Sequence, residues 1–126
     1  MAENIQKEQR GRRLFVVIPC YNEEEVLPET AKRLKEKLAS LKKSGMIAEN
    51  SRVLFVNDGS ADRTWELIRG LHEEDPMYQG IDLARNSGHQ NALVAGLFTA
   101  AGLCDMTISM DADLQDDINV IDQMVE

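Results

Sequence analysis

The carboxyl-terminal part of the chain contains a concentration of acidic side chains. Arg85 is the last basic residue, and from Asp105 onward there are seven acidic residues and no basic one. The whole chain has 14 basic and 22 acidic residues, so these seven account for most of its net charge of −8. Crowded carboxylates repel one another unless a cation joins them. The segment is therefore either a solvated acidic face, which composition alone favours, or a metal site.

Asp111 and Asp113 have the spacing that best suits a metal. If Asp111 ends a strand, both carboxylates project the same way, while Ala112 points into the packing. Mg²⁺ and Mn²⁺ take oxygen ligands and commonly bind one or two carboxylates together with the phosphates of a substrate. Gln115 adds a neutral oxygen nearby. An Asp-x-Asp sequence taken alone is more often a turn or a helix cap.

The apolar patterns predict the elements that must position these residues. Short β-branched runs predict strands at 14–19, 53–57, 80–84 and 106–110. Between them, helices are predicted at 27–41, from Asp62 to before Pro76, and at 90–101. The alternation of strands and helices predicts an α/β fold with a mostly parallel sheet and helices on both faces.

Further expectations concern particular segments. Asp62 is expected to cap the second helix, and the third is apolar on most sides, so we expect it to be buried. Residues 1–11 are expected to be a mobile tail, and 12–126 the domain proper. The chain ends just inside a helix that begins near Asp117, with Asp116 and Asp117 as its cap, which suggests a truncated domain.

Every predicted strand is followed by polar residues. In open parallel sheets, ligands bind beyond the carboxyl ends of the strands, so this agreement predicts one binding rim. No G-x-G-x-x-G, G-x-x-x-x-G-K-[ST] or G-x-S-x-G motif is present. A nucleotide bound here would lack a glycine-rich phosphate loop, and a carboxylate-held divalent cation would be the natural partner of its diphosphate. The acidic composition argues against nucleic-acid binding.

Cellular setting is also indicated by the sequence. Cys20 and Cys104 form no disulfide framework or metal-ligand pair. No apolar run reaches the roughly 20 residues of a membrane span, and the first residues lack the hydrophobic core of a signal peptide. A reducing, cytoplasmic location is therefore expected.

Four motifs at the strand ends resemble those of the family 2 glycosyltransferases, which have the GT-A fold. They are Pro19-x-Tyr21-Asn22-Glu23-Glu24, Asn57-Asp58-Gly59-Ser60-x-Asp62-x-Thr64, Asn86-x-Gly88 and Asp111-Ala-Asp113-Leu-Gln115-Asp116. The resemblance covers residues 13–126, and the last motif looks most like the polyprenyl-phosphate branch, which includes dolichol- and undecaprenyl-phosphate glycosyltransferases.

The resemblance implies roles for individual residues. The nucleotide-binding residues would be Pro19, Tyr21, Glu23, Asp58, Asn86, Gly88 and Asp111. The metal ligands would be Asp113, Gln115 and Asp111. The other readings are structural: Glu24 and Glu25 suit the first turn of a helix, Asp62 and Thr64 suit a cap, and a loop histidine such as His89 is more often solvated than catalytic.

The function that the resemblance implies is transfer of a sugar from a UDP- or GDP-sugar donor, with Mg²⁺ or Mn²⁺, by a single displacement. The acceptor would be a polyprenyl phosphate at the cytoplasmic face of the membrane, in cell-envelope biosynthesis. Such an acceptor is already ionised near neutral pH and needs no strong base. The acceptor groove and membrane contacts are expected after Glu126, and a homo-oligomer is compatible with the sequence.

Three alternatives remain open. The acceptor could be a sugar hydroxyl in polysaccharide synthesis, which would require a base. The chain could be a non-catalytic nucleotide-binding module. It could also be an unrelated α/β domain whose acidic end binds Mg²⁺ for phosphoryl chemistry. Residues 1–126 alone are expected to bind a donor without turning it over.

Overall fold

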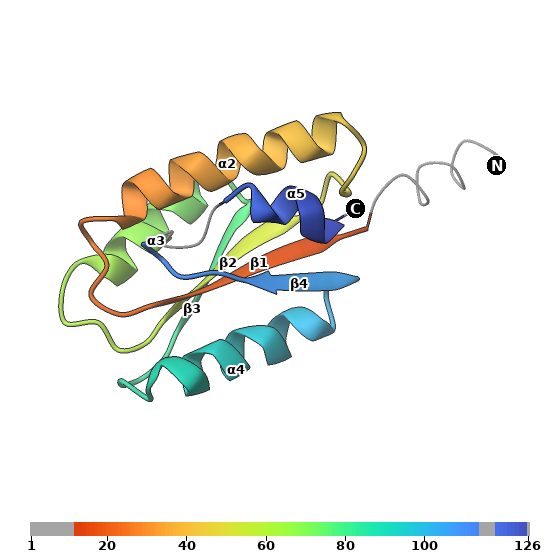
Figure 1. The fold of residues 1–126 in the computed structure, drawn as a ribbon. Helices are drawn as coiled ribbons and strands as arrows, with labels where there is room; N and C mark the ends of the chain where they lie inside the picture. Colours follow the sequence, from red (N-terminus) through yellow and green to blue (C-terminus); the bar gives the residue numbers. More distant parts are fainter. Residues whose placement is uncertain (1–11, 114–117, 126) are drawn as a thin grey trace.

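The computed structural model describes residues 12–113 and 118–125, in which a four-stranded parallel sheet lies between two layers of helices (Figure 1). The strands are β1 (Leu14–Cys20), β2 (Arg52–Asn57), β3 (Tyr78–Asp82) and β4 (Met106–Ser109), in the order β3-β2-β1-β4. The helices are α2 (Leu27–Lys43), α3 (Thr64–Glu74), α4 (His89–Ala101) and α5 (Val120–Val125). The expectations for the tail 1–11 and for Gln115, Asp116 and Asp117 lie outside the described residues.

The predicted order of strands and helices is confirmed, with small shifts at the ends of elements. The largest shift is in α5, which begins at Val120 rather than near residue 117. Strand β3 begins at Tyr78 rather than at residue 80 and ends at Asp82. Tyr78 pairs with Val53 of β2, and its ring stacks on Phe55 at a centroid distance of 6.0 Å. These contacts extend the strand toward Pro76, beyond the apolar run that predicted it.

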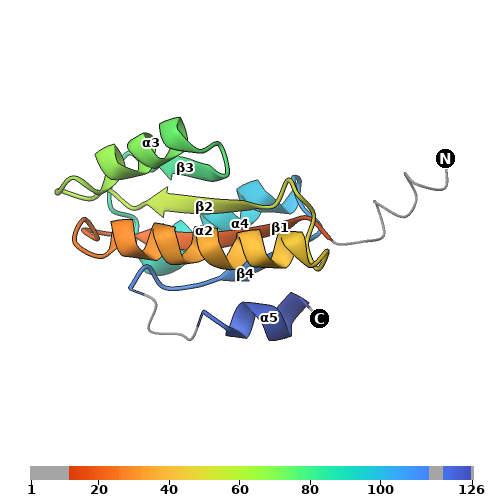
Figure 2. The same ribbon diagram turned by 90° about the horizontal axis from the view of Figure 1, so that it is seen from above.

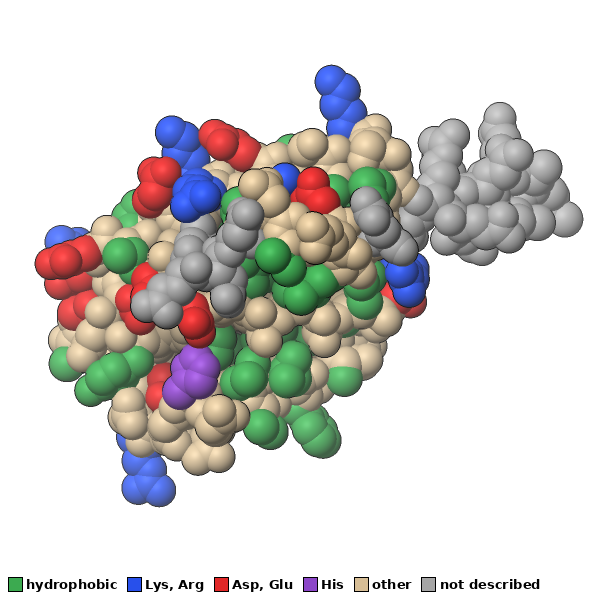
Figure 3. All heavy atoms as spheres, in the orientation of Figure 1, with side chains coloured by type: hydrophobic (Ala, Val, Ile, Leu, Met, Phe, Trp, Pro, Cys, Tyr) green, Lys and Arg blue, Asp and Glu red, His purple; other side chains and the backbone are tan. Residues whose placement is uncertain are grey.

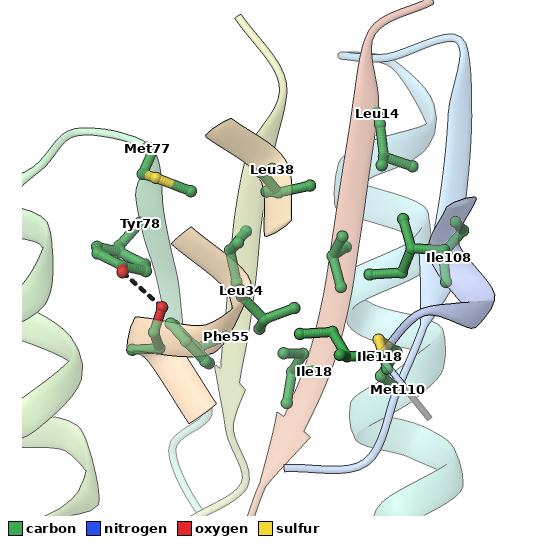
Figure 4. Close-up of a cluster of buried hydrophobic side chains, with 14 of the residues drawn as sticks. Leu14, Ile18, Leu34, Leu38, Phe55, Met77, Tyr78, Ile108, Met110 and Ile118 are labelled. Atoms are coloured by element: carbon green, nitrogen blue, oxygen red, sulfur yellow. Dashed lines mark hydrogen bonds between the residues drawn. The ribbon is translucent and has the colours of Figure 1, made fainter. Parts of the chain in front are cut away.

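Alternate residues of the sheet face opposite helical layers. Helices α2, α3 and α5 cover one face of the sheet, as the two views of the ribbon show (Figures 1 and 2). Leu14, Val16 and Ile18 of β1 belong to the core on that face. On the other face, Phe15 and Val17 pack against α4. Figure 4 shows the first of these cores, where Leu34 and Leu38 of α2 point toward the strands. The buried strands thus have a cover on both sides, as their nearly continuous hydrophobicity predicted.

Helix α2 is held by the apolar stripe that predicted it. The residues of that stripe are all buried: Leu27, Ala31, Leu34, Leu38 and Leu41. The hydroxyl of Tyr78 donates a hydrogen bond of 2.7 Å to the carbonyl of Ala31, drawn as a dashed line in Figure 4, and so ties α2 to β3. At the other side of the helix, Lys37 Nζ lies 3.0 Å from a carboxylate oxygen of Asp122 in α5.

The expectation that the third helix is buried on most sides is wrong. Only Ala92, Gly96 and Ala100 of α4 are buried, whereas the side chain of Phe98 is 84% exposed and that of Val94 57% exposed. The reason is the close approach of the helix to the sheet: a Cβ on Gly96 would lie 2.5 Å from Cγ1 of Val17. Small residues make this contact, and Leu93 and Leu97 are partly buried beside them. Val94 and Phe98 are left on the outer side of the helix.

Within the described ranges, none of the helices has the length and apolar character needed to cross a lipid bilayer.

Candidate functional site

A pocket of about 370 Å³ lies at the carboxyl ends of all four strands. Eight of the nine predicted site residues line it: Pro19, Tyr21, Glu23, Asp58, Asn86, Gly88, Asp111 and Asp113. The ninth, Gln115, lies outside the described residues. In the space-filling view, acidic side chains and a histidine gather toward the end of the molecule where these strands finish (Figure 3). The residues from the four motifs therefore share one pocket, while their individual roles stay predictions.

The first group of pocket residues follows β1. Pro19 is buried near the end of that strand, whereas Tyr21 is 49% exposed beside the pocket. Between Tyr21 and Glu23, the chain turns at Asn22, whose φ is +53°. Asn has a short side chain that tolerates this left-handed conformation. The turn places both neighbours of Asn22 in the lining of the pocket.

The loop after β2 contributes Asp58, which is only 2% exposed. One carboxylate oxygen of Asp58 accepts a 2.7 Å hydrogen bond from the backbone N–H of Ser87, and its carbonyl accepts one from the side-chain amide of Asn86. Asp58 therefore lines the pocket and also holds the loop after β3 in position. The sequence did not indicate this second role.

Gly59 allows the loops after β2 and β3 to touch. Its φ is +68°, and a Cβ at this position would lie 2.2 Å from the backbone nitrogen of Asn86. No other residue type has both the conformational freedom and the lack of a side chain that this contact requires. The glycine of the Asn-Asp-Gly-Ser sequence thus brings Asp58 and Asn86 to the same side of the pocket.

Asp62 differs from the sequence expectation. Helix α3 begins at Thr64 with Arg63 as its N-cap residue, and no side chain caps it at that position. The carboxylate of Asp62 does accept the backbone N–H of Thr64, at 2.9 Å. It also accepts the N–H of Glu24, at 3.2 Å, in the loop after β1. Asp62 therefore joins two loops rather than only starting one helix.

The acidic residues after β4 are positioned by the residue between them. Ala112 is buried in the core under α2, and its carbonyl accepts a hydrogen bond from the hydroxyl of Thr30, which is itself buried. Asp111 and Asp113 on either side of it line the pocket. The strand ends at Ser109, so the two aspartates lie in the segment beyond it, although Ala112 points inward as expected.

Neighbouring carboxylates disfavour the ionisation of Glu23. Partial burial raises the pKa of Glu23 above its ordinary value, and the negative charges of Asp113, Asp62 and Asp111 raise it further. A divalent cation would relieve this repulsion, and carboxylate oxygens are the ligands that Mg²⁺ and Mn²⁺ prefer. The donor set of Asp111 and Asp113 therefore fits such a cation. Among residues 12–113 and 118–125, no group of three or more His, Cys, Asp or Glu side chains is arranged to hold a metal by itself.

Three further residues of the pocket were not predicted: Cys20, His89 and Ala112. Burial, followed by the charge of Glu23, raises the pKa of the Cys20 thiol well above its usual range, so the thiol is protonated and not a nucleophile. His89 is the first residue of α4 and follows Gly88, whose φ is +93°. Its place directly after the Asn86-x-Gly88 motif is the sequence signal that would have found it.

Comparison with known proteins adds a second line of observation. The model of the family "Glycosyl transferase family 2" matches residues 15–126. The chain is 52% identical over 108 residues to "Uncharacterized glycosyltransferase YkoT" of Bacillus subtilis (strain 168), covering 86% of this chain and 32% of that protein. It is 38% identical over 114 residues to "Bactoprenol glucosyl transferase" of Shigella phage SfV, covering 90% of this chain and 34% of that one.

A solved structure has the same fold. The chain superimposes on a mannosyltransferase, PcManGT from Pyrobaculum calidifontis in complex with GDP-Man and Mn²⁺, with a TM-score of 0.66 and 24% identity. The match covers 81% of this chain and 28% of that one, so the present chain has part of a GT-A fold. It spans about a third of the length of the curated relatives it matches. Since the family model covers almost the whole chain, this chain belongs to glycosyl transferase family 2.

Proposed function

We propose that the pocket binds the nucleoside diphosphate of a UDP- or GDP-sugar together with Mg²⁺ or Mn²⁺, and that the complete enzyme transfers the sugar to a polyprenyl phosphate. The observation that carries this proposal is that Asp58 and Asp113, which follow different strands, line one pocket. Had they been on opposite sides of the molecule, a nucleotide could not have reached both.

The pocket has a part suited to a nucleoside. Tyr21 offers a half-exposed ring on which a base can stack, and its hydroxyl can hydrogen-bond. Glu23 and Asp58 offer carboxylates that can accept from a ribose hydroxyl or from the N–H of uracil or guanine. Pro19, Asn86 and Gly88 shape the backbone around them.

The pocket residues that follow β4 are suited to a cation and a diphosphate. Asp111 and Asp113 would hold the metal, and Gln115 would add a ligand. When bound, the metal supplies positive charge where the departing nucleoside diphosphate becomes more negative. The mannosyltransferase with the same fold was solved with GDP-Man and Mn²⁺, which supports the binding of both a nucleotide sugar and a metal.

The acceptor is inferred from the relatives and from chemistry. A relative 38% identical to this chain is named a bactoprenol glucosyl transferase, and bactoprenol is a polyprenol. The oxygen of a polyprenyl phosphate is ionised near neutral pH, since the second pKa of a phosphate is about 6. It can therefore attack the anomeric carbon in a single displacement without a strong base, and no such base is required among the pocket residues.

Calorimetric titration of the chain with UDP and with GDP, each with and without Mn²⁺, tests the proposal. We expect binding of one nucleoside diphosphate that depends on Mn²⁺ and is abolished in Asp113→Ala. The control is Glu49→Ala, which removes an exposed carboxylate in the turn before β2, at the other end of the sheet. Binding without metal would indicate a non-catalytic nucleotide module, and a preference for bare phosphate would indicate phosphoryl chemistry.

A transfer assay tests the reaction itself. Radiolabelled UDP- and GDP-sugars are incubated with a prenyl phosphate or a sugar acceptor, using residues 1–126 and a polypeptide as long as the relatives. We expect sugar to reach the prenyl phosphate only with the longer polypeptide. Turnover by residues 1–126 would contradict the expectation that acceptor residues follow Glu126, and transfer to the sugar acceptor alone would contradict the assignment of the acceptor.

A further inference from the structure

The loops after β1 and β2 are joined by a set of hydrogen bonds that the sequence motifs did not indicate. Three consecutive backbone N–H groups of the first loop donate to side chains of the second. These bonds are Asn22 N to Ser60 Oγ (2.9 Å), Glu23 N to Thr64 Oγ1 (2.8 Å) and Glu24 N to Asp62 Oδ2 (3.2 Å). In the other direction, Asn22 Oδ1 accepts from Ala61 N at 2.8 Å and from Asp62 N at 3.4 Å. We call these five bonds the loop–loop network.

Asn22 is the centre of this network. Among the described residues it is the one non-glycine residue with a positive φ, and it contributes both a donor and an acceptor to the opposite loop. Its two neighbours, Tyr21 and Glu23, line the pocket. The left-handed turn at Asn22 therefore sets where these two side chains lie, and the network holds that turn in place.

Thr64 connects the network to a rigid element. It is the first residue of α3 and is fully buried. Its hydroxyl oxygen accepts the N–H of Glu23 and its proton is donated to Asp62 Oδ1. Through this hydroxyl, the backbone of Glu23 is fixed to the start of a helix that packs on the sheet.

We propose that Asn22 and Thr64 are positioning residues that preorganise the nucleoside part of the pocket, an inference that rests on the proposed function. Neither residue is required to touch the ligand. A loop that is already ordered loses little conformational entropy on binding, whereas a loosened loop must be ordered by the ligand at a cost in affinity. The network therefore sets the affinity for the base and ribose.

The aspartates of the cation part are attached to a different element of the fold. Asp111 and Asp113 follow β4, and Ala112 between them is held by Thr30 of α2. Loosening the loop–loop network should thus weaken binding of a nucleoside diphosphate and leave binding of Mn²⁺ with pyrophosphate unchanged. A general loss of structure would weaken both.

The test compares these two ligands on four variants of the full chain. Asn22→Gly removes the side-chain acceptor but keeps the left-handed conformation accessible. Asn22→Asp keeps an acceptor oxygen at the same place. Thr64→Val removes the hydroxyl with nearly the same shape. Asn50→Gly is the matched control, because Asn50 is exposed in a turn before β2, at the far end of the sheet.

We measure dissociation constants for Mn²⁺ with whichever of UDP and GDP binds the wild-type chain, and for Mn²⁺ with pyrophosphate. Asn22→Gly and Thr64→Val should each weaken nucleoside diphosphate binding by about tenfold, the effect of one or two hydrogen bonds, with pyrophosphate affinity within about twofold of wild type. Asn22→Asp should restore most of the loss, and any effect of its added charge should fall equally on both ligands. Asn50→Gly should change neither affinity.

Equal weakening of both ligands in Asn22→Gly and Thr64→Val, or no weakening of either ligand in these two variants, would overturn the inference and leave the proposed function intact. A wild-type chain that binds neither UDP nor GDP would instead contradict the proposed function. Thermal unfolding of each variant shows whether it is folded. If Asn22→Gly is unfolded, Thr64→Val and Asn22→Asp still decide the question.

Discussion

The nucleoside and cation parts of the pocket are positioned in different ways. Tyr21, Glu23 and Asp58 lie on loops that bond to one another through side-chain and backbone groups. Asp111 and Asp113 lie on either side of an alanine buried in the core, whose carbonyl is bonded to Thr30 of a neighbouring helix. The first part is shaped by contacts between loops and the second by attachment to the helical layer, so substitutions should affect the two parts separately.

The largest effect is expected from adding a side chain at Gly59, where the loops after β2 and β3 touch. Gly59→Ala would place a Cβ 2.2 Å from the backbone of Asn86 and force a left-handed conformation on alanine. We expect the free energy of unfolding to fall by about 3 kcal/mol, from backbone strain and overpacking together. Denaturant unfolding monitored by circular dichroism measures this change.

Gly70→Ala is the control for that substitution. Nothing lies within 4 Å of a Cβ at Gly70, which is inside α3. Alanine is favoured over glycine in a helix, so we expect stability to rise by up to about 1 kcal/mol. Similar stabilities for the two variants would mean that the loops after β2 and β3 do not depend on their contact at Gly59.

The next effect concerns the cation part. Thr30→Val leaves the buried carbonyl of Ala112 without its hydrogen bond, which should lower the free energy of unfolding by about 2 kcal/mol. The affinity for Mn²⁺ should also fall, because Asp111 and Asp113 are less firmly placed. Thr99→Val is the control: its exposed hydroxyl bonds only within α4, to Ala95. Unchanged Mn²⁺ affinity in Thr30→Val would show that α2 does not position the acidic segment.

Binding of the metal itself should stabilise the fold by a smaller amount. Since the cation relieves repulsion among carboxylates of the folded chain, Mn²⁺ at about five times its dissociation constant should add about 1 kcal/mol of stability. Thermal unfolding with increasing Mn²⁺ measures the shift in Tm. Asp113→Asn should reduce this shift, and an equal shift in wild type and variant would place the metal elsewhere.

The smallest effect is expected from pH. Burial and neighbouring carboxylates raise the pKa of Glu23, so the folded chain keeps this proton to a higher pH than the unfolded chain does. Ionisation of Glu23 therefore costs stability above its folded pKa, and the cost is absent below its ordinary value of 4.5. In metal-free buffer, Glu23→Gln should be more stable than wild type by about 0.3 kcal/mol at pH 7, since solvent screens this partly exposed group, and equally stable at pH 3. A larger difference at pH 3 than at pH 7 would contradict this account.

Much of the fold was predictable because the patterns that formed it are local. The apolar stripe from Leu27 to Leu41 and the continuous runs of β1 and β2 each indicate one element, and the structure has those elements. Helix α4 was misjudged because an apolar helix with small residues suggests burial all round. The sequence does not show that only the side bearing Gly96 meets the sheet.

The pocket residues were predictable because the carboxyl ends of parallel strands meet at one edge of a sheet. The residues that position them were not. Thr30 and Ala112 are distant in sequence, as are Asn22 and Ala61, and their hydrogen bonds exist only once the chain has folded. Asp62 suited a helix cap by its local sequence, and its second bond, to Glu24, comes from another loop.

Whether the pocket needs a metal ion to bind a nucleotide decides between the proposed site and its alternatives. The affinity of the chain for UDP and for GDP is measured by calorimetry at fixed Mn²⁺, and again after the metal is removed with a chelator. We expect one of the two nucleotides to bind with Mn²⁺, and we expect binding to be abolished when the metal is removed or Asp113 is replaced with alanine. Equal affinity with and without Mn²⁺ would contradict it.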